Sequence, residues 1–160
     1  MHRTIDPTIL YFGTPVALVS TLNPDGTANL APRSSAWWMG CTCMLGLGQM
    51  SQTSGNLLST RECVINLPSS DLVSHVDRLE GVVHHYRSFG KNVNANVFEV
   101  HIENLHVAEE LLSSESGRPH IDPVKWRPLI MTFCRFFELG GEVLPSRLAE
   151  SEFMKQVMAA

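Results

Sequence analysis

The chain has 160 residues, of which 44% are hydrophobic and 18% charged, and its formal net charge is -4 at pH 7. This acidic balance argues against a nucleic acid partner, and the lack of an apolar run of about 18 residues argues against membrane contact, so we expect a cytoplasmic protein. The length predicts a single domain over residues 1–160, and the low charge predicts that a second subunit covers part of its apolar surface.

The first predicted elements are three successive strands. Residues 14–22 are rich in β-branched side chains, and the following Asn23-Pro24-Asp25-Gly26 is a strong turn signal. Residues 27–39 form the second strand and residues 41–48 the third, which predicts an antiparallel meander. Neither arm alternates cleanly between polar and apolar residues, so we expect both faces to be covered, as in a small closed barrel.

Shorter elements follow the predicted meander. Ser51 is an N-cap candidate for a short helix over residues 51–60. Residues 63–67 have the composition of a strand that ends at a proline, and residues 69–80 have the spacing of an amphipathic helix.

The second half of the chain contains less regular segments. Residues 81–96 show no clear period, so we expect an atypical short connection there. Residues 97–107 alternate again and predict one long strand. We expect the apolar residues 129–137 to form a helix or turn that packs onto the barrel or onto a partner chain.

The four cysteines lie in apolar, strand-like surroundings without a zinc-type spacing. They are Cys41, Cys43, Cys63 and Cys134. We therefore expect reduced thiols in the core and no metal site. Because Cys41 and Cys43 are two residues apart on a predicted strand, a minor alternative is that both face the same side and contact a ligand.

No phosphate-binding glycine loop, dinucleotide fingerprint or nucleophile-elbow serine is present. What remains is the serine and tryptophan run at residues 34–37 and the hydroxyl-rich start of the helix predicted at Ser51. Unpaired N–H groups at a helix N-terminus favour an anion, so one interpretation is a phosphate there with a flat heteroaromatic ring along the strand. In the alternative interpretation, Ser51 is only an N-cap, and Trp37 and Trp38 only fill an interface.

Three stretches that carry these residues occur in a characteristic order, namely YFGTPVALVSTLNPDGTANLAPRSSAWWMG, LGLGQMSQTSGNL and ECVINLPS. Over residues 5–79 the chain resembles the flavin reductase-like, FMN-binding split-barrel family, and HIDPVKWRPLIMTFCRFFELG resembles the C-terminal segment of one branch. The resemblance implies a mainly β fold, a homodimer of six-stranded Greek-key split barrels with short flanking helices and with FMN at the subunit interface. It also implies NAD(P)H-dependent reduction of flavin, often for a partner monooxygenase.

The resemblance implies two groups of cofactor-binding residues in this sequence. The first would line the isoalloxazine ring and the ribityl chain, and it consists of Asn29, Leu30, Ala31, Pro32, Ser34, Ser35, Ala36 and Trp37. The second would hold the phosphate, and it consists of Ser51, Thr53 and Asn56. The protein then supplies orientation and hydrogen bonds to the cofactor, not a dedicated acid and base.

The sequence also departs from the family. Between Leu79 and Val97 the family normally has a longer stretch with further barrel strands, so we expect a reduced barrel. This departure supports an alternative in which FMN is lost. The chain would then be a cofactor-free isomerase, cyclase or lyase, or a binding protein, with a pocket for a small organic molecule of the secondary-metabolite type. For that alternative the candidate catalytic residues are Arg33, Trp37 and, on the predicted late strand, His106.

Overall fold

A computed structural model describes residues 12–80, 95–113, 119–122 and 124–144. The chain divides into two compact units, of which the first combines residues 1–104 with residues 128–138 and the second combines residues 105–127 with residues 139–160. The connection expected over residues 81–96 lies outside the described residues except for its last two. The prediction of a single domain stays a prediction.

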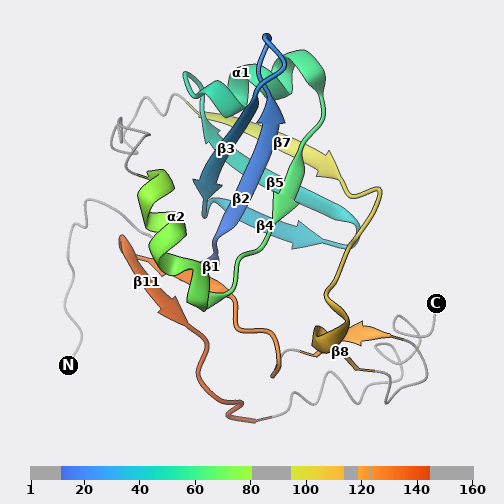
Figure 1. Cartoon of the computed structure of the whole chain (residues 1–160), viewed down its shortest axis with the longest axis vertical. Coiled ribbons are helices and arrows are strands. Elements are labelled where there is room, and N and C mark those ends of the chain that lie inside the picture. Colours follow the sequence, from blue (N-terminus) through green and yellow to red (C-terminus); the bar gives the residue numbers. More distant parts are fainter. Residues whose placement is uncertain (1–11, 81–94, 114–118, 123, 145–160) are drawn as a thin grey trace, which may run out of the picture. The chain divides into compact units, whose positions relative to one another are not determined.

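Within the described residues, the first unit contains three antiparallel sheets of three strands and two α-helices (Figure 1). The strands are β1 (Thr14–Pro15), β2 (Ala17–Leu22), β3 (Ala28–Arg33), β4 (Ala36–Met39), β5 (Thr42–Gly48), β6 (Val64–Asn66), β7 (Ala95–His101), β10 (Leu129–Thr132) and β11 (Arg135–Glu138). The helices are α1 (Gln52–Thr60), the short 3-10 helix η1 (Ser70–Leu72) and α2 (Val73–Glu80). The strand orders are β3-β2-β6, β4-β5-β7 and β1-β10-β11. The mainly β architecture with short helices is therefore confirmed, and the homodimer stays a prediction.

The predicted hairpin turn joins β2 to β3. The N–H of Gly26 donates to the carbonyl of Asn23 at 2.9 Å, and the N–H of Asn23 donates to the carbonyl of Thr27 at 2.9 Å. The hydroxyl of Thr27 donates to the carboxylate of Asp25 at 2.6 Å and lowers the pKa of that carboxyl. Gly26 has a φ of +81°, which explains why a residue without a Cβ stands there.

The strand predicted over residues 27–39 is divided into two strands that belong to different sheets. β3 pairs with β2, whereas β4 pairs with β5. At the division, the carbonyl of Ser34 accepts a hydrogen bond from the hydroxyl of Thr14 at 2.5 Å, and the carbonyl of Ser35 accepts one from the N–H of Gly46 at 2.7 Å. The prediction of a simple meander is therefore wrong, because these bonds hold the chain at a corner where it leaves one sheet and enters the next.

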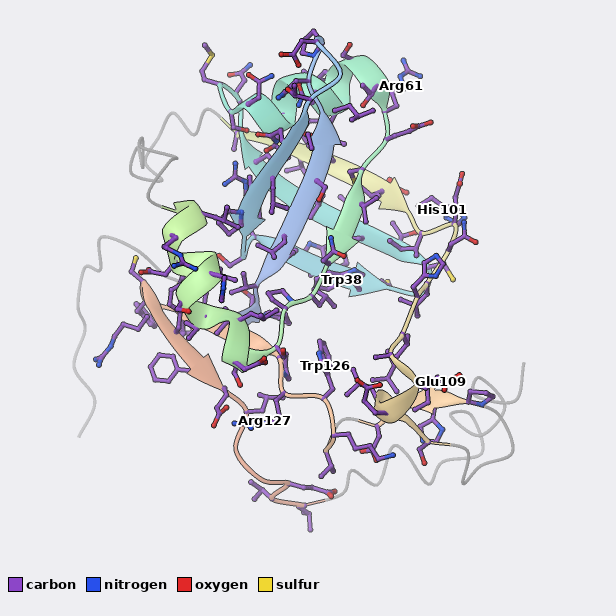
Figure 2. All side chains as sticks on the ribbon, viewed as in Figure 1. Trp38, Arg61, His101, Glu109, Trp126 and Arg127 are labelled. Carbon is purple, nitrogen blue, oxygen red and sulfur yellow. The ribbon has the colours of Figure 1, made fainter. Side chains whose placement is uncertain are left out.

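The main core lies between the β3-β2-β6 and β4-β5-β7 sheets, which cross in Figure 1. Its buried side chains come from β2, β4, β5 and α1, and they are Ala17, Val19, Ala36, Cys43, Leu45, Leu47 and Leu57. Trp38 is partly buried against this cluster (Figure 2). On β5 every second residue is buried, which leaves Thr42, Met44 and Gly46 on the opposite face of the strand.

The predicted helices are confirmed. Ser51 is the N-cap of α1, and its side chain accepts a hydrogen bond from the N–H of Ser54 at 3.2 Å. The helix ends at Thr60, and the C-cap residue Arg61 has a φ of +61° and an N–H that donates to the carbonyl of Leu57 at 3.0 Å (Figure 2). On α2, Val76 packs with Val16, Leu129 and Met131 in a second buried cluster. No helix among the described residues is long and apolar enough to span a bilayer.

Two of the later predictions differ from the structure. β7 ends at His101 and not at residue 107, because its partner β5 begins at Thr42, directly opposite His101 (Figure 2). The last bond of this ladder runs from the N–H of Ile102 to the carbonyl of Cys41 at 2.8 Å. Residues 129–137, expected as a helix or turn, contribute β10 and most of β11, and β10 also pairs with β1.

The cysteines occupy two kinds of environment. Cys43 is buried and Cys63 is half-buried, whereas Cys41 and Cys134 are exposed. The prediction of core thiols thus holds for only two of the four residues. Cys41 lies in the turn between β4 and β5, so it does not share a strand face with Cys43, and the idea that both face one ligand is wrong.

We expect the two pairs of cysteines to differ in reactivity. Burial raises the pKa of the Cys43 thiol to about 11 and also raises the pKa of the Cys63 thiol, so both stay protonated at mildly alkaline pH. In the native protein, iodoacetamide at about pH 8 should label Cys41 and Cys134 first, and all four thiols should react in denaturant. Peptide mass spectrometry after short labelling measures this, and labelling of Cys43 as fast as Cys41 would contradict it.

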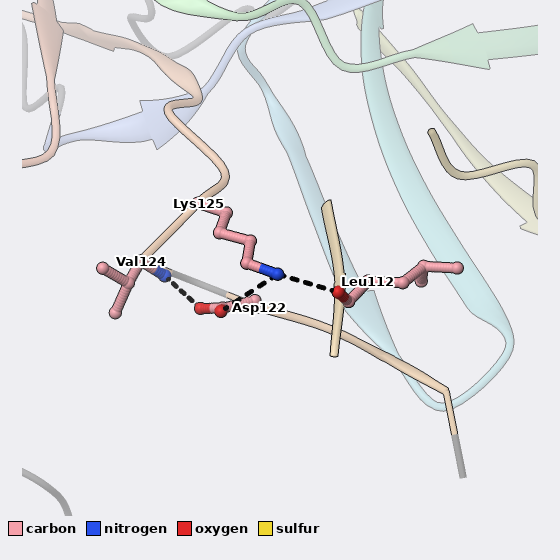
Figure 3. A network of polar contacts seen from close by, with 4 residues as sticks. All are labelled: Leu112, Asp122, Val124 and Lys125. Atoms are coloured by element: carbon pink, nitrogen blue, oxygen red, sulfur yellow. Dashed lines mark hydrogen bonds and ion pairs between the residues drawn. The ribbon is translucent and has the colours of Figure 1, made fainter. Parts of the chain in front are cut away.

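The second unit contains the 3-10 helix η2 (Glu109–Leu111) and a small hairpin of β8 (Leu112–Ser113) and β9 (His120–Ile121). Polar contacts around Asp122 hold the chain that follows the hairpin (Figure 3). The carboxylate of Asp122 accepts a bond from the N–H of Val124 at 2.9 Å, and the ammonium of Lys125 lies 3.9 Å from it. The same ammonium donates to the carbonyl of Leu112 at 3.0 Å.

Candidate functional site

A cavity of about 420 Å³ lies in the first unit, next to the corner between β3 and β4. Its lining residues are Phe12, Thr14, Ser34, Ser35, Ala36, Trp37, Met44, Gly46 and Val97. This volume falls within the range of about 300–1,000 Å³ that is usual for small-molecule sites. Four of the lining residues, at positions 34–37, are among those to which the family resemblance gives contacts with a flavin ring and its ribityl chain.

The pairing of three strands builds the floor of this cavity. Trp37 of β4 stands opposite Met44 of β5, and Gly46 of β5 stands opposite Val97 of β7. Met44 and Gly46 belong to the face of β5 that points away from the buried Cys43, Leu45 and Leu47. The cavity therefore lies on the face of the β4-β5-β7 sheet opposite to the core.

Gly46 allows the corner to lie directly against β5. A Cβ placed on Gly46 would lie only 3.1 Å from the Cβ of Ser35 and 3.6 Å from its carbonyl oxygen. The hydrogen bond of 2.7 Å from the N–H of Gly46 to this carbonyl fixes the approach. Any side chain at position 46 would therefore press on the corner and occupy the cavity.

The chemistry of the cavity is mainly apolar. None of its described lining residues carries a charge, and the polar groups of its side chains are the hydroxyls of Thr14, Ser34 and Ser35 and the indole N–H of Trp37. Two aromatic side chains on it remain open, since Phe12 is 70% exposed and Trp37 is 54% exposed. Apolar and aromatic walls with a few hydroxyl groups suit a flat ring system that carries a polar chain.

A second group of polar residues ties the start of α1 to β2 and β3. The amide of Asn56 donates to the hydroxyl of Thr21 at 3.0 Å and to the side-chain oxygen of Asn23 at 2.9 Å. The amide of Asn29 donates to the hydroxyls of Thr21 at 3.0 Å and Thr53 at 3.1 Å. We call these five residues the polar network, and its members Thr21, Thr53 and Asn56 are buried.

The side chains of the polar network bond to one another, whereas the N-terminus of α1 remains accessible to a ligand. Both donor positions of the Asn56 amide are used, and its oxygen accepts a bond from Gln52 at 2.8 Å. Ser51 is only half-buried, and the N–H groups of the first helical turn have no helix carbonyl to bond to. The N–H of Ser51 donates to the carbonyl of Gly48 at 2.9 Å, two residues or roughly 6–7 Å along β5 from Gly46.

The cofactor-binding residues expected from sequence thus fall into three sets. Ser34, Ser35, Ala36 and Trp37 line the cavity. Asn29, Thr53 and Asn56 belong to the polar network, and Ser51 caps the helix beside them. Leu30, Ala31 and Pro32 lie on β3 outside both groups. Contact of any of these residues with a cofactor stays a prediction.

The two remaining candidates occupy different places. Arg33 directly precedes the cavity residue Ser34, is half-buried, and donates to the carbonyl of Pro32 at 2.9 Å. His106 belongs to the second unit and is exposed. The expectation that His106 lies on the late strand is wrong, since β7 ends at His101.

Several residues of the site were not predicted from the sequence. Met44 and Gly46 carried a signal, because they alternate with the apolar residues of their strand. Thr21 carried a weaker one, as a polar residue in an otherwise apolar strand. Val97 had none, because only the pairing of β7 with β5 brings it to the corner. Phe12 had none either, because it precedes β1 and reaches the corner through the pairing of β1 with β10.

No family model matches the chain. A related sequence is the uncharacterized protein YdfE of Bacillus subtilis (strain 168), which is 30% identical over 88% of this chain and 91% of that protein. The alignment spans 191 positions but includes only 88% of the 160 residues of this chain, or about 141, so about 50 of these positions lie opposite gaps in this chain. The chain is therefore shortened relative to YdfE.

Three solved structures show the same fold over most of the chain. The flavoredoxin of Desulfovibrio vulgaris (Miyazaki F) has a TM-score of 0.76 at 17% identity, covering 94% of this chain and 100% of that chain. Nitrilotriacetate monooxygenase component B from Bacillus cereus has a TM-score of 0.70 at 14% identity, covering 91% of this chain and 100% of that chain. The styrene monooxygenase flavin reductase from Pseudomonas putida S12 has a TM-score of 0.59 at 10% identity, covering 83% and 95%. The chain therefore belongs to the same family as YdfE and has the split-barrel fold of flavoredoxins and flavin reductases.

Proposed function

We propose that the chain is an FMN-binding oxidoreductase of the flavin reductase type, which reduces flavin with NADH or NADPH. The observation that carries the proposal is the position of the cavity. It is lined by residues 34–37 and lies on the same strand, β5, that leads into the N-terminus of α1. A flat apolar site beside an anion-binding helix end matches the two ends of FMN.

The lining of the cavity fits the ring end of the cofactor. Trp37 and Met44 offer apolar surface to an isoalloxazine ring, and Gly46 keeps the floor flat. The hydroxyls of Ser34 and Ser35 offer hydrogen bonds to the ribityl chain and the ring edge. The proposal therefore assigns ring contacts to the corner between β3 and β4.

The helix end fits the phosphate. The hydroxyl of Ser51 and the N–H groups of Gln52 and Thr53 form the first turn of α1, where the helix dipole favours an anion. The polar network packs against this turn, so we assign the side chains of Asn29, Thr53 and Asn56 to positioning the helix, and only the backbone N–H of Thr53 to the phosphate. This assignment needs no lysine at the phosphate.

When bound, the flavin ring supplies hydride acceptance from a nicotinamide and hydride or electron donation to the next acceptor. The residues of this chain bind and orient the ring against the sheet and exclude water from its covered face. We propose no proton-transferring side chain, because the described lining of the cavity contains no carboxyl, imidazole, amine, phenol or thiol group. Catalysis then rests on orientation.

The proposal includes a homodimer, and a monooxygenase as the partner that takes up reduced flavin. The face of the sheet that carries the cavity exposes large apolar side chains, with Trp37 at 54%, Met39 at 73% and Val97 at 68% exposure. Isolated chains seldom leave such a patch open, so a second copy is expected to cover it. Two of the similar structures are named as monooxygenase components, which supports a partner of that class.

The test is the visible spectrum of the purified protein after FMN is added and unbound FMN is removed. Retained FMN near one per chain, bleached by NADH or NADPH, supports the proposal. A matched pair of variants then tests the phosphate site. Ser51→Gly removes the hydroxyl but keeps most of the capping stability, and we expect it to weaken FMN binding about tenfold, whereas Ser59→Ala on the exposed side of α1 should not. Equal affinity of the two variants would contradict the assignment.

A second candidate function has one observation in its favour, the absence of charge among the described residues that line the cavity. A neutral, apolar cavity also suits a small organic ligand without a phosphate. In that case the protein is a binding protein or a cofactor-free enzyme. The residues to examine are then Trp37 and Arg33, which directly precedes the cavity residue Ser34. A protein that retains no FMN in the same experiment would favour this candidate.

A further inference from the structure

The tip of the β10–β11 hairpin has an unusual backbone. Thr132 pairs with Arg135, so the turn consists of only Phe133 and Cys134, and their φ angles are +45° and +59°. A two-residue turn with positive φ at both positions favours asparagine and glycine, which tolerate the left-handed conformation. Phenylalanine and cysteine are strained there, and nothing in the hairpin itself requires them.

The ring of Phe133 contacts the ring of Phe12. Their centroids are 5.9 Å apart and the ring planes meet at 84°, which is the edge-to-face arrangement favoured by aromatic pairs. The pairing of β1 with β10 explains the contact. Thr14 stands opposite Met131, and the same register continued by two residues brings Phe12 to Phe133. Gly13 permits this close approach, because a Cβ there would lie 3.2 Å from the side chain of Ile130.

Core packing does not account for Phe133. It is 51% exposed and does not belong to the buried cluster formed by Val16, Val76 and the β10 residues Leu129 and Met131. Its ring contact is with Phe12, which lines the cavity and is itself 70% exposed. The strained turn thus places an aromatic ring beside a wall of the candidate site.

We propose that Phe133 is a positioning residue, which holds the ring of Phe12 as an aromatic wall against the planar ring of the bound ligand. Phe12 contacts the ligand, and Phe133 acts through Phe12. The strain at the hairpin tip is the consequence of placing a bulky ring where an Asn-Gly turn would otherwise fit. This inference rests on the proposed function, because it takes the flavin ring as the ligand.

Three variants test the inference by FMN titration, read from the quenching of flavin fluorescence, together with thermal denaturation. Phe133→Asn removes the ring and suits the left-handed backbone, so we expect FMN affinity to fall about three- to tenfold while the Tm does not fall. Cys134→Gly relieves strain and keeps the ring, so the Tm should rise and FMN affinity should not change. In a Phe12→Leu background, Phe133→Asn should have no further effect on affinity.

The outcomes separate this inference from the proposed function. If the wild-type protein does not bind FMN, both are overturned. If the wild-type protein binds FMN and Phe133→Asn binds it equally well, the inference alone is overturned. It is also overturned if Phe133→Asn lowers FMN affinity by the same factor whether position 12 is Phe or Leu. A loss of FMN affinity that occurs only together with a fall in Tm would overturn it as well.

Discussion

Replacing Asn56 with alanine is expected to lower the free energy of unfolding by about 2–4 kcal/mol. The Asn56 side chain is 2% exposed and donates to Thr21 at 3.0 Å and to Asn23 at 2.9 Å. Its loss removes these two hydrogen bonds and the one that its oxygen accepts from Gln52 at 2.8 Å. It also leaves acceptors on β2 and the following turn without these donors, and opens a small cavity under α1. Chemical denaturation followed by circular dichroism measures the change.

Gln52→Ala is the matched control for this prediction. Gln52 lies one turn earlier on the same helix, is exposed, and donates one bond, to the side-chain oxygen of Asn56 at 2.8 Å. We expect its loss to change the free energy of unfolding by no more than about 1 kcal/mol. If Asn56→Ala were no more destabilising than Gln52→Ala, the polar network would not be the structural support of α1 described above.

Replacing Gly46 with valine is expected to reduce FMN affinity by about 100-fold or more, and replacing it with alanine by about tenfold. The Cβ of either residue would lie 3.1 Å from the Cβ of Ser35, whose carbonyl is held by the N–H of Gly46 at 2.7 Å. Because the carbonyl of the preceding Ser34 is also held, by Thr14 at 2.5 Å, the corner cannot easily move away. The larger side chain also fills part of the cavity.

Gly48→Ala provides the control on the same face of the same strand. A Cβ at position 48 meets no atom within 4 Å. We therefore expect its FMN affinity to stay within about threefold of the wild type and its stability to be unchanged or higher. FMN titration and thermal denaturation of the four proteins measure both effects. Equal FMN affinity of the two alanine variants would mean that the ligand does not lie over Gly46.

Several elements follow from local chemistry, and the sequence alone predicted them. The turn at residues 23–26 has the residues that its backbone angles require. Ser51 caps α1 because a hydroxyl at that position bonds to an N–H of the first turn. The family resemblance, carried by residues 5–79, also predicted the split-barrel fold.

The composition of the candidate site depended on contacts between residues far apart in the chain. The pairing of β7 with β5 brings Val97 opposite Gly46, and the pairing of β1 with β10 brings Phe12 close to Phe133. No local sequence pattern marks either contact. Pairing between distant strands also explains why two predictions of secondary structure were wrong. The length of β7 is set by where β5 begins, and residues 129–137 became strands because β1 pairs with β10.

The amino-acid sequence by itself thus determined the helices, the hairpin turn, the fold family and the four residues at positions 34–37 that line the cavity. Only the tertiary structure decided that the predicted second strand breaks at Ser34 and Ser35, that Asn56 and Thr53 are buried, and that Gly46 forms the floor. The physical reason is that caps and turns are satisfied by neighbouring residues, whereas a sheet corner and a buried polar network are satisfied by partners on other strands and helices, such as Thr21, which lies 35 positions before Asn56.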